Sequence, residues 1–420
     1  MNKRSGLMTA LAVAAALGAG PAVAAEPASV VETYADIAHA KYQDSLETAR
    51  ALGEKVDALL AEPNALTLAA AREAWRAARV PYQQTEVYRF GNVIVDEWEG
   101  KVNAWPLDEG MIDYVARDFY GDMSDANRYY TANVIANEQL QLSGRTIDAS
   151  VIDASLLQDE LHEVDGIEAN VATGYHAIEF LLWGQDLNGV EPGAGARPAT
   201  DFDLENCTHG HCDRRGEYLE AATDLLISDL EWITAQWAEG GEARAAVVDD
   251  PASGLVAMLT GMGSLSYGEL AGERMKLGLM LHDPEEEHDC FSDNTHYSHY
   301  YNAVGMRNVF HGRYVGPDGA VTEGPGLADL LPEAERNALA AALDNSVAHM
   351  QVLVDEAMAG RPYDVLLAPG NADGNAKIDA AVTSLLTQTK AIERAAAALQ
   401  VEGVGIEGSD SLDDPAAVMQ

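Results

Sequence analysis

The amino-acid sequence predicts an all-α fold of two helical-bundle domains joined by long irregular connections. Apolar residues recur at steps of three and four along most of the chain, the period of an amphipathic helix, whereas the alternation typical of strands is scarce. A loop rich in glycine and proline, residues 184–213, separates two such helical sets. We therefore expect one bundle in residues 26–200, a second in 201–400, and a flexible tail in 401–420.

In the first domain, the apolar spacing predicts a long helix followed by a second that bends near Pro81, because proline lacks the backbone N–H of a helix interior. Residues 91–110 contain two tryptophans and a proline and are expected to be irregular. The helices expected in this domain cover residues 30–60, 65–90, 126–142 and 153–183.

The second domain repeats this organisation with longer, alanine-rich helices. Residues 282–302, rich in His, Asp and Glu, and the glycine-rich residues 316–326 are expected to be irregular. The helices expected here cover residues 217–237, 254–280, 332–358 and 376–399.

The two halves share a faint internal similarity. Glu86 and Arg89 follow a tyrosine in the first half, and Glu269 and Arg274 follow one in the second. An ancient duplication would explain the pattern, and so would coincidence between two helical bundles.

The N-terminus has the layout of a secretory signal peptide. Lys3 and Arg4 precede an apolar run over residues 7–19, and small residues follow at 22–25. The run is shorter than the roughly 20 residues of a membrane span, and no cysteine follows the cleavage site. We expect residues 1–25 to be removed and the mature chain, which has no further candidate span, to be periplasmic or otherwise extracytoplasmic.

The formal net charge of -42 narrows the choice of partners. Such a surface argues against binding to nucleic acid or to an anionic membrane. It suits cationic partners, or simply a well-solvated surface.

Three cysteines occur in the sequence. Cys207 and Cys212 are close together in a polar segment and could close a short loop in an oxidising compartment. Cys290 would then be left over, unless it pairs with one of them.

The pair His176 and Glu179 is the strongest local candidate for chemistry. On a helix, residues three apart lie on one face, so an imidazole and a carboxylate could bind one cation together. Their flanks are strongly apolar, which implies burial, and a buried charge needs a partner. That partner is either a metal ion or, more simply, the other member of the pair.

The segment Gly174–Gly184, GYHAIEFLLWG, resembles the signature of the imelysin family, in its iron-regulated-protein-A-like branch. The family mark GxHxxE is matched by Gly174, His176 and Glu179. The resemblance extends over most of the mature chain, and other segments that agree with the family are residues 75–90, 105–108, 206–215 and 289–296.

This resemblance implies two helical bundles, a motif near their interface, and a bacterial envelope protein tied to iron uptake. Related iron-transport proteins use the HxxE pair as metal ligands together with acidic residues from other helices. By that analogy the expected ligands are His176 and Glu179, with Glu86 and then Asp108 as further candidates. The expected cargo is iron, or an iron complex, with zinc as the alternative, and an envelope transport component is a possible partner.

Further cleft residues are expected around this site. Arg89 and Trp105 lie in family-like stretches of the first half, and Asp293 and His296 lie in the His-rich region of residues 282–311. A solvated acidic loop with incidental histidines is the alternative for that region.

The imelysin family is also catalogued among metallopeptidases, because an early member was described as insulin-cleaving. The sequence offers little support for that activity. HExxH fails because Gly166 stands where the second His is needed after His162, and HxxEH fails because Phe180 follows Glu179. A catalytic zinc needs three protein ligands, an open position and a general base. The remaining alternatives are a zinc metallopeptidase and a structural or partner-binding envelope module that holds no metal.

Overall fold

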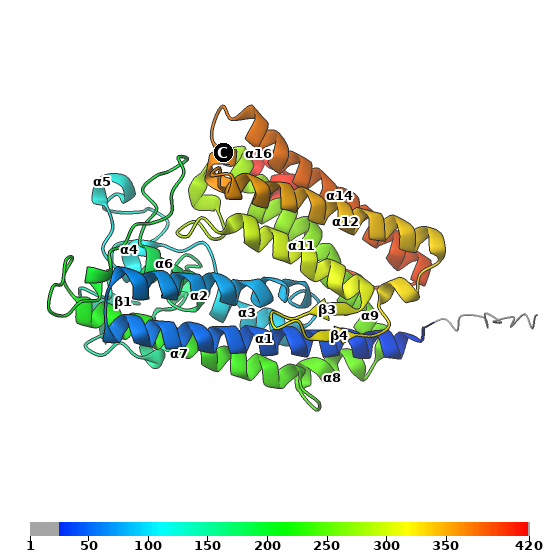
Figure 1. Ribbon diagram of the computed structural model, residues 1–420, viewed down its shortest axis with the longest axis horizontal. Coiled ribbons are helices and arrows are strands. Elements are labelled where there is room, and N and C mark those ends of the chain that lie inside the picture. The colour runs from blue at the N-terminus through cyan, green and yellow to red at the C-terminus, as the bar shows by residue number, and fades with distance from the viewer. Residues whose placement is uncertain (1–24, 419–420) are drawn as a thin grey trace, which may run out of the picture.

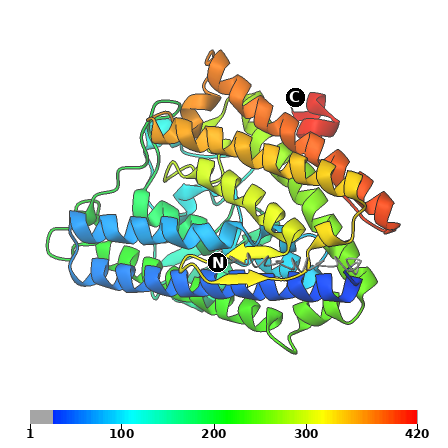
Figure 2. The same ribbon diagram turned by 45° about the vertical axis from the view of Figure 1, so that its right-hand side comes forward.

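The computed structural model describes residues 25–418 of the chain. The predicted signal peptide falls almost entirely on residues 1–24, outside the described residues. Helices dominate and form two layers, which Figures 1 and 2 show one above the other, so the all-α prediction is confirmed. No helix within residues 25–418 is long and apolar enough to cross a bilayer.

The first layer is built around α1 (Pro27–Ala61), which packs against α2 (Ala65–Gln83) and α7 (Cys212–Trp237). Proline at the first turn suits the start of α1 because its missing N–H has no helical partner there. Asn64 begins α2 with a capping box, in which its side chain accepts from the backbone of Thr67 while Thr67 accepts in return.

The second layer contains α11 (Thr295–His311), α12 (Glu333–Met358) and α14 (Ala372–Leu399). The π-helix η5 (Leu265–Leu277) continues α9 (Pro251–Ser264) and packs against α14. Figure 1 shows this layer in yellow to red above the blue and green helices of the first.

The remaining elements are short and connect the two layers. The helices are η1 (Glu86–Tyr88), α3 (Val93–Asn103), α4 (Glu109–Ile112), α5 (Arg117–Tyr120), η2 (Leu156–Leu161), η3 (Val164–Gly166), α6 (Gly174–Trp183), η4 (Ala199–Asp201), α8 (Glu242–Val248), α10 (Gly278–Leu281), η6 (Pro284–Glu286), η7 (Leu327–Asp329), α13 (Tyr363–Leu367), α15 (Asp410–Asp413) and α16 (Pro415–Val418). The strands form two antiparallel hairpins, β1 (Gln139–Leu142) with β2 (Arg145–Asp148) and β3 (Arg313–Val315) with β4 (Val321–Glu323).

The residues of the faint internal similarity meet where the layers join. Arg274 Nη2 lies 2.6 Å from Glu86 Oε2, and Arg89 Nη1 lies 3.5 Å from Glu269 Oε2. Arg274 also pairs with Glu269 of its own half at 2.7 Å, so the two glutamates and the two arginines form one network that joins the halves. We call the two contacts between the halves the crossed ion pairs.

Several local predictions were wrong. Residues 93–103 form α3, because Val95, Trp98 and Val102 give that segment a buried helical face. Residues 126–142 form turns and strand β1 rather than a helix, and the glycine-rich segment 316–326 contributes the β3–β4 hairpin.

Two contacts lie at the predicted ends of the second domain. The segment expected to be a flexible tail packs along η5, where Ser411 Oγ donates to the carbonyl of Gly272 at 3.0 Å. Helix α7, which follows the predicted domain boundary at residue 200, packs against α1 and α6 of the first domain. The boundary itself stays a prediction.

Candidate metal centre

Helix α6 carries the GxHxxE motif, and all its residues from Gly174 to Trp183 are buried. Gly174 begins the helix with φ +78°, and a Cβ there would lie 2.4 Å from the carbonyl oxygen of Val102. Only glycine fits this close approach. The helix is fixed from its other side by Trp75, whose Nε1 donates to the carbonyl of Tyr175 at 2.9 Å. The glycine of the motif is therefore required by packing, and it places His176 in the interior.

His176 and Glu179 face each other on α6, as their spacing predicts. Nδ1 of His176 lies 3.1 Å from Oε2 of Glu179. The other carboxylate oxygen of Glu179 accepts from both the backbone N and the Oγ of Ser292, at 3.0 and 2.6 Å. Nε2 of His176 is buried and has no hydrogen-bond partner among the described residues.

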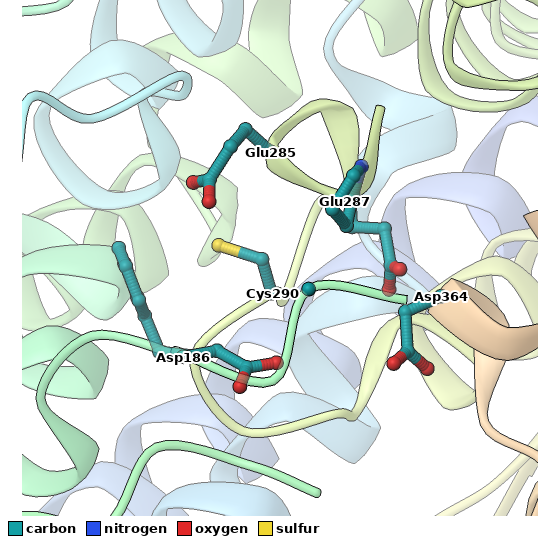
Figure 3. A pocket seen from close by; sticks show the side chains of 8 residues that line it. Asp186, Glu285, Glu287, Cys290 and Asp364 are labelled. Carbon is teal, nitrogen blue, oxygen red and sulfur yellow. The ribbon is translucent and has the colours of Figure 1, made fainter. Parts of the chain in front are cut away.

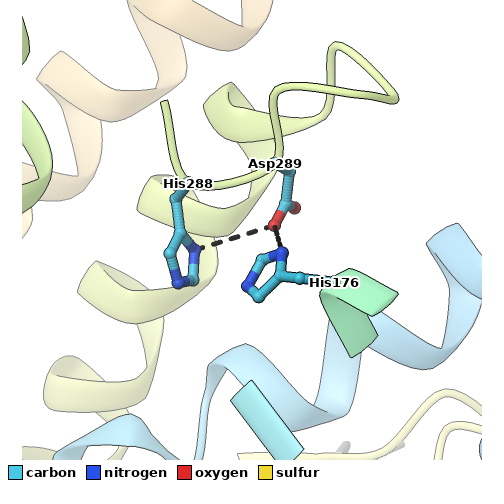
Figure 4. A group of neighbouring side chains, drawn as sticks. All are labelled: His176, His288 and Asp289. Carbon is cyan, nitrogen blue, oxygen red and sulfur yellow. Dashed lines mark ion pairs between the residues drawn. The ribbon is translucent and has the colours of Figure 1, made fainter. Parts of the chain in front are cut away.

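Two residues from the segment before α11 complete the group (Figure 4). Asp289 Oδ1 lies 4.0 Å from His176 Nδ1 and 3.6 Å from His288 Nδ1. One ligand atom from each of these three residues lies within 4.8 Å of the others. We refer to His176, Glu179, His288 and Asp289 as the His/Asp centre.

Arg79 on α2 supplies the positive charge of this centre. Its Nη2 donates to Asp289 Oδ1 at 2.8 Å and lies 3.4 Å from His288 Nδ1, and its Nη1 donates to Asn103 Oδ1 at 2.6 Å. The other oxygen of Asp289 accepts from Asn294 at 2.9 Å and from the hydroxyl of Ser298. Asp289 is thus held in one orientation, with Oδ1 turned toward the two imidazoles.

These surroundings set the protonation of the centre. Burial, reinforced by Arg79, lowers the pKa of His176 to about 3, and burial likewise lowers the pKa of His288. Burial alone would raise the pKa of Asp289, but Arg79 and then His176 outweigh it and bring that pKa to about 2. Burial, with the charge of Asp289, raises the pKa of Glu179 well above its ordinary value.

The centre therefore holds two neutral imidazoles and one ionised carboxylate, beside the Glu179 carboxyl, whose pKa is raised. Neutral imidazoles and a carboxylate are the donor set of non-haem iron and of zinc. The unpartnered Nε2 and the converging donor atoms fit a metal ion. The competing structural role is a buried ion pair between Arg79 and Asp289.

A cavity of about 290 Å³ leads from the surface between α2 and α11 toward this centre. Arg79 and Ser298, both in contact with Asp289, form part of its lining together with Tyr297 and Tyr301.

The two further ligands proposed from the family analogy lie elsewhere among the described residues. Glu86 belongs to the crossed ion pairs, and Arg89 beside it contacts Glu99 and Asp96 as well as Glu269. Burial raises the pKa of Glu86 although Arg274 opposes it. The network reaches the centre only indirectly, through Asn103, which bonds both Glu99 and Arg79.

Asp108 and Trp105 line a different cavity, of about 250 Å³. Asp108 accepts from Asn127, and burial raises the pKa of its carboxyl. The Trp105 ring lies 5.9 Å from the His288 ring, edge to face, so this cleft adjoins the centre on the side opposite α2. Glu86 and Asp108 as metal ligands thus stay predictions, and the geometry favours His288 and Asp289 in their place.

Asp293 and His296 follow the centre in sequence. His296 is mostly buried, stacks on Tyr297, and has an Nδ1 without a partner. Asp293 Oδ2 accepts from the backbone N of Gly193 at 3.2 Å and faces a separate acidic group described below. Cys207 and Cys212 form the expected disulfide, and Cys290 is free.

Sequence reasoning did not single out Arg79, His288 and Asp289. His288 and Asp289 were visible as members of a dense His/Asp/Glu stretch, but nothing in that stretch marked which members turn inward. Arg79 gave no signal, because a lone arginine on a helix is normally a surface residue.

The chain matches the family model described as imelysin, a peptidase M75 family, over residues 38–392. The chain belongs to the imelysin family. A 46-residue segment, 11% of this chain, is 44% identical to iron-regulated protein A of Synechococcus elongatus, and it spans only 13% of that protein.

Two solved structures share the fold of this imelysin. One is a protein of Parabacteroides distasonis provisionally named iron-regulated protein A precursor, 17% identical, with a TM-score of 0.61 and coverage of 90% of this chain and 98% of that one. The other is an imelysin-like protein of Psychrobacter arcticum, 15% identical, with a TM-score of 0.57 and coverage of 91% of this chain and 99% of that one. At these identities the likeness establishes the fold alone.

Proposed function

We propose that this imelysin binds iron, or a small iron complex, at the His/Asp centre and serves bacterial iron uptake outside the cytoplasm. The observation that carries the proposal is the convergence of two neutral imidazoles and an ionised carboxylate in a buried space, with Nε2 of His176 left without a partner. A buried imidazole nitrogen without a partner is costly unless something binds it.

The donor set argues for a transition metal. Imidazole nitrogens suit iron and zinc, whereas calcium and magnesium prefer oxygen ligands alone. Two histidines with one carboxylate are the donor set of many ferrous sites, and zinc is the alternative ion. A metal bound beside Glu179 would displace the proton of its carboxyl, so binding is expected to strengthen as pH rises.

The surroundings orient the ligands. Asn294 and Ser298 hold Asp289, and Ser292 holds Glu179, so two of the four groups are fixed by hydrogen bonds from outside the centre. Such outer contacts fix ligand orientation and tune metal affinity. Arg79 keeps Asp289 ionised even without metal, so the carboxylate is ready to bind.

Two observations support the proposed role in iron uptake outside the cytoplasm. The relatives named above carry iron-regulated names, and the first residues of the chain have the pattern of a secretory signal. A periplasmic location and contact with an envelope iron-transport component are part of the proposal.

Metal analysis of the purified mature protein, loaded separately with ferrous, ferric and zinc ions, tests the proposal. We expect one bound ion per chain, and none in the double variant His176→Ala, Glu179→Ala. The double variant His211→Ala, Glu217→Ala changes an exposed His just before α7 and an exposed Glu on α7, and it serves as the control, with binding unchanged. Equal metal binding by the first variant and the native chain would refute the proposal. Hydrolysis of a peptide library that needs metal and stops in Glu179→Gln would instead favour the peptidase.

A further inference from the structure

A second group of acidic side chains lies close to the His/Asp centre but shares none of its residues (Figure 3). Asp186 follows α6, Asp293 precedes α11, and Asp364 lies in α13. Figure 3 labels two of them, Asp186 and Asp364. One carboxylate oxygen from each lies within 4.8 Å of the others. The carboxylate of Glu287 points toward Asp364 in the same view. We call these four residues the acidic centre.

The inner part of the acidic centre, Asp364 and Glu287, is buried and short of partners, whereas Asp186 and Asp293 are partly exposed. Asp364 and Glu287 are each only 2% exposed. Neither carboxylate oxygen of Asp364 has a hydrogen-bond partner among the described residues, and Oε1 of Glu287 has none either. Across residues 25–418, no lysine, arginine or histidine forms an ion pair with any of the four. This contrasts with the buried Asp289, whose charge Arg79 compensates.

Buried carboxylates without a counter-charge are strongly unfavourable, so the group must hold either protons or a cation. Burial and the neighbouring carboxylates raise the pKa of Asp364 to about 7, and burial with Asp186 raises the pKa of Asp293 to about 6. The carboxylate oxygens that face one another in this centre can instead share one cation.

We propose that the acidic centre is a binding site for a hard divalent cation, with Ca²⁺ as the favoured ion and Asp186, Asp293 and Asp364 as its ligands. Calcium takes carboxylate and carbonyl oxygens in flexible geometry, and the donors here are oxygens alone. A cavity of about 10 Å³ lies among Asp186, Glu287 and Asp364, which is about the room of one water molecule or ion. This site is independent of the proposed iron function and lies outside the family motif.

Cys290 lines the same cavity but does not change the choice of ion. Burial and nearby glutamates raise the pKa of its thiol well above the ordinary value, so the sulfur stays protonated. A protonated thiol is a poor metal ligand.

The position of the site indicates what the cation would do. Asp293 lies four residues after Asp289 in the sequence, so a cation bound there would fix the C-terminal end of the segment that completes the His/Asp centre. Asp186 adds the loop after α6, and Asp364 adds the second helical layer. One ion would thus join the three segments and hold the iron ligands in place.

Calcium titration of the calcium-free mature protein tests the proposal, with Mg²⁺ as the comparison ion and thermal unfolding as a second readout. We expect one Ca²⁺ per chain and a rise in Tm with Ca²⁺ concentration. Asp364→Asn keeps the side-chain shape but removes one charge, and it should weaken Ca²⁺ binding on the order of tenfold or more. Asp224→Asn, an exposed site on α7, and Cys290→Ser should bind Ca²⁺ like the native chain.

The stability of Asp364→Asn measured in chelator distinguishes a cation ligand from a purely structural residue, even if the variant folds poorly. If Asp364 is a cation ligand, Asp364→Asn should be at least as stable as the native chain in chelator, because a repelling charge is gone. If its carboxylate were only a structural hydrogen-bond acceptor, the variant would be less stable with or without Ca²⁺. That outcome, or Ca²⁺ binding unchanged in Asp364→Asn, would overturn the proposal. The variant His176→Ala, Glu179→Ala should still bind Ca²⁺, so the two sites fail independently.

Discussion

The His/Asp centre and the acidic centre share two stretches of chain, the region of α6 and the segment before α11, and α13 adds Asp364 to the acidic centre, but the two centres compensate their charges in opposite ways. In the first, the guanidinium of Arg79 faces Asp289 at 2.8 Å and keeps it ionised. In the second, Asp186, Asp293 and Asp364 face one another, and no cationic side chain among the described residues pairs with them.

This difference in charge compensation indicates which kind of ion each centre needs. A centre with a built-in cation stays folded without a metal, and its neutral imidazoles offer lone pairs to a transition ion. A centre without one needs protons or a hard cation from solution. Four predictions test this contrast, from the largest effect to the smallest.

Removing the two α6 ligands should abolish transition-metal binding. In His176→Ala, Glu179→Ala the site loses an imidazole and a carboxylate, and the remaining His288 and Asp289 cannot hold iron or zinc alone. Helix content by circular dichroism should stay near the native value, since both side chains are replaced by a good helix former. If this variant still bound iron at the native stoichiometry, the His/Asp centre would not be the transition-metal site.

Removing Arg79 should be the most costly single change for stability. Arg79→Met leaves Asp289 buried without its partner, and breaking a buried pair in this way costs about 3–5 kcal/mol. The double variant Arg79→Met, Asp289→Asn should recover much of the loss, because the uncompensated charge is gone. Urea unfolding measures both. Arg50→Met is the control, since its pair with Glu231 is half exposed and surface pairs are worth about 0–1 kcal/mol.

The two centres should respond to pH with opposite sign in chelator. Asp364, with its pKa raised to about 7, binds a proton more tightly folded than unfolded, so stability falls as pH rises from about 4 to 7. His176, with its pKa lowered to about 3, loses stability as pH falls from about 6.5 to 3. Unfolding free energies of the native chain and Asp364→Asn, compared from pH 5 to 8, should diverge by roughly 2 kcal/mol in favour of the variant at high pH. Calcium should cancel the divergence, and parallel curves would contradict the assignment.

Ser292→Ala should have the smallest effect. The change removes the hydroxyl donor to Glu179 and leaves the backbone donor in place. Loss of an outer contact of this kind weakens metal affinity about tenfold, with a stability loss of about 1 kcal/mol. A metal titration followed by unfolding separates the two effects. Ser253→Ala, which removes an exposed bond to Asp250, is the control and should leave metal affinity unchanged.

Local signals predicted the helices well, because long amphipathic segments such as residues 27–61 and 372–399 carry a strong period. The same period failed for residues 126–142, where the turns around Asn133 and the β1–β2 hairpin use backbone bonds to Gly110 and Met111 far away in the sequence. Tertiary contacts of that kind leave no local pattern.

The residues of the candidate site likewise fall into those that the sequence could predict and those that it could not. His176 and Glu179 were predictable because helical spacing alone brings them together. His288 and Asp289 were not, because the turn before α11 decides which members of a polar stretch face inward. Arg79, a sequence distance of 210 from Asp289, could be recognised only from the packing of α2 against that turn.

The crossed ion pairs indicate the order in which the two halves of this protein can fold during synthesis. Glu86 is buried beside Arg274, which is synthesised 188 residues later. Until Arg274 has been synthesised, Glu86 lacks the arginine that pairs with it in the folded protein. The first half is therefore expected to stay unfolded while the second half is still being translated. A chain cut at residue 260 is therefore expected to be digested throughout its first layer in limited proteolysis, and a protease-resistant fragment of that layer would show otherwise. Such a delay keeps the first half unfolded until nearly two-thirds of the chain has been made.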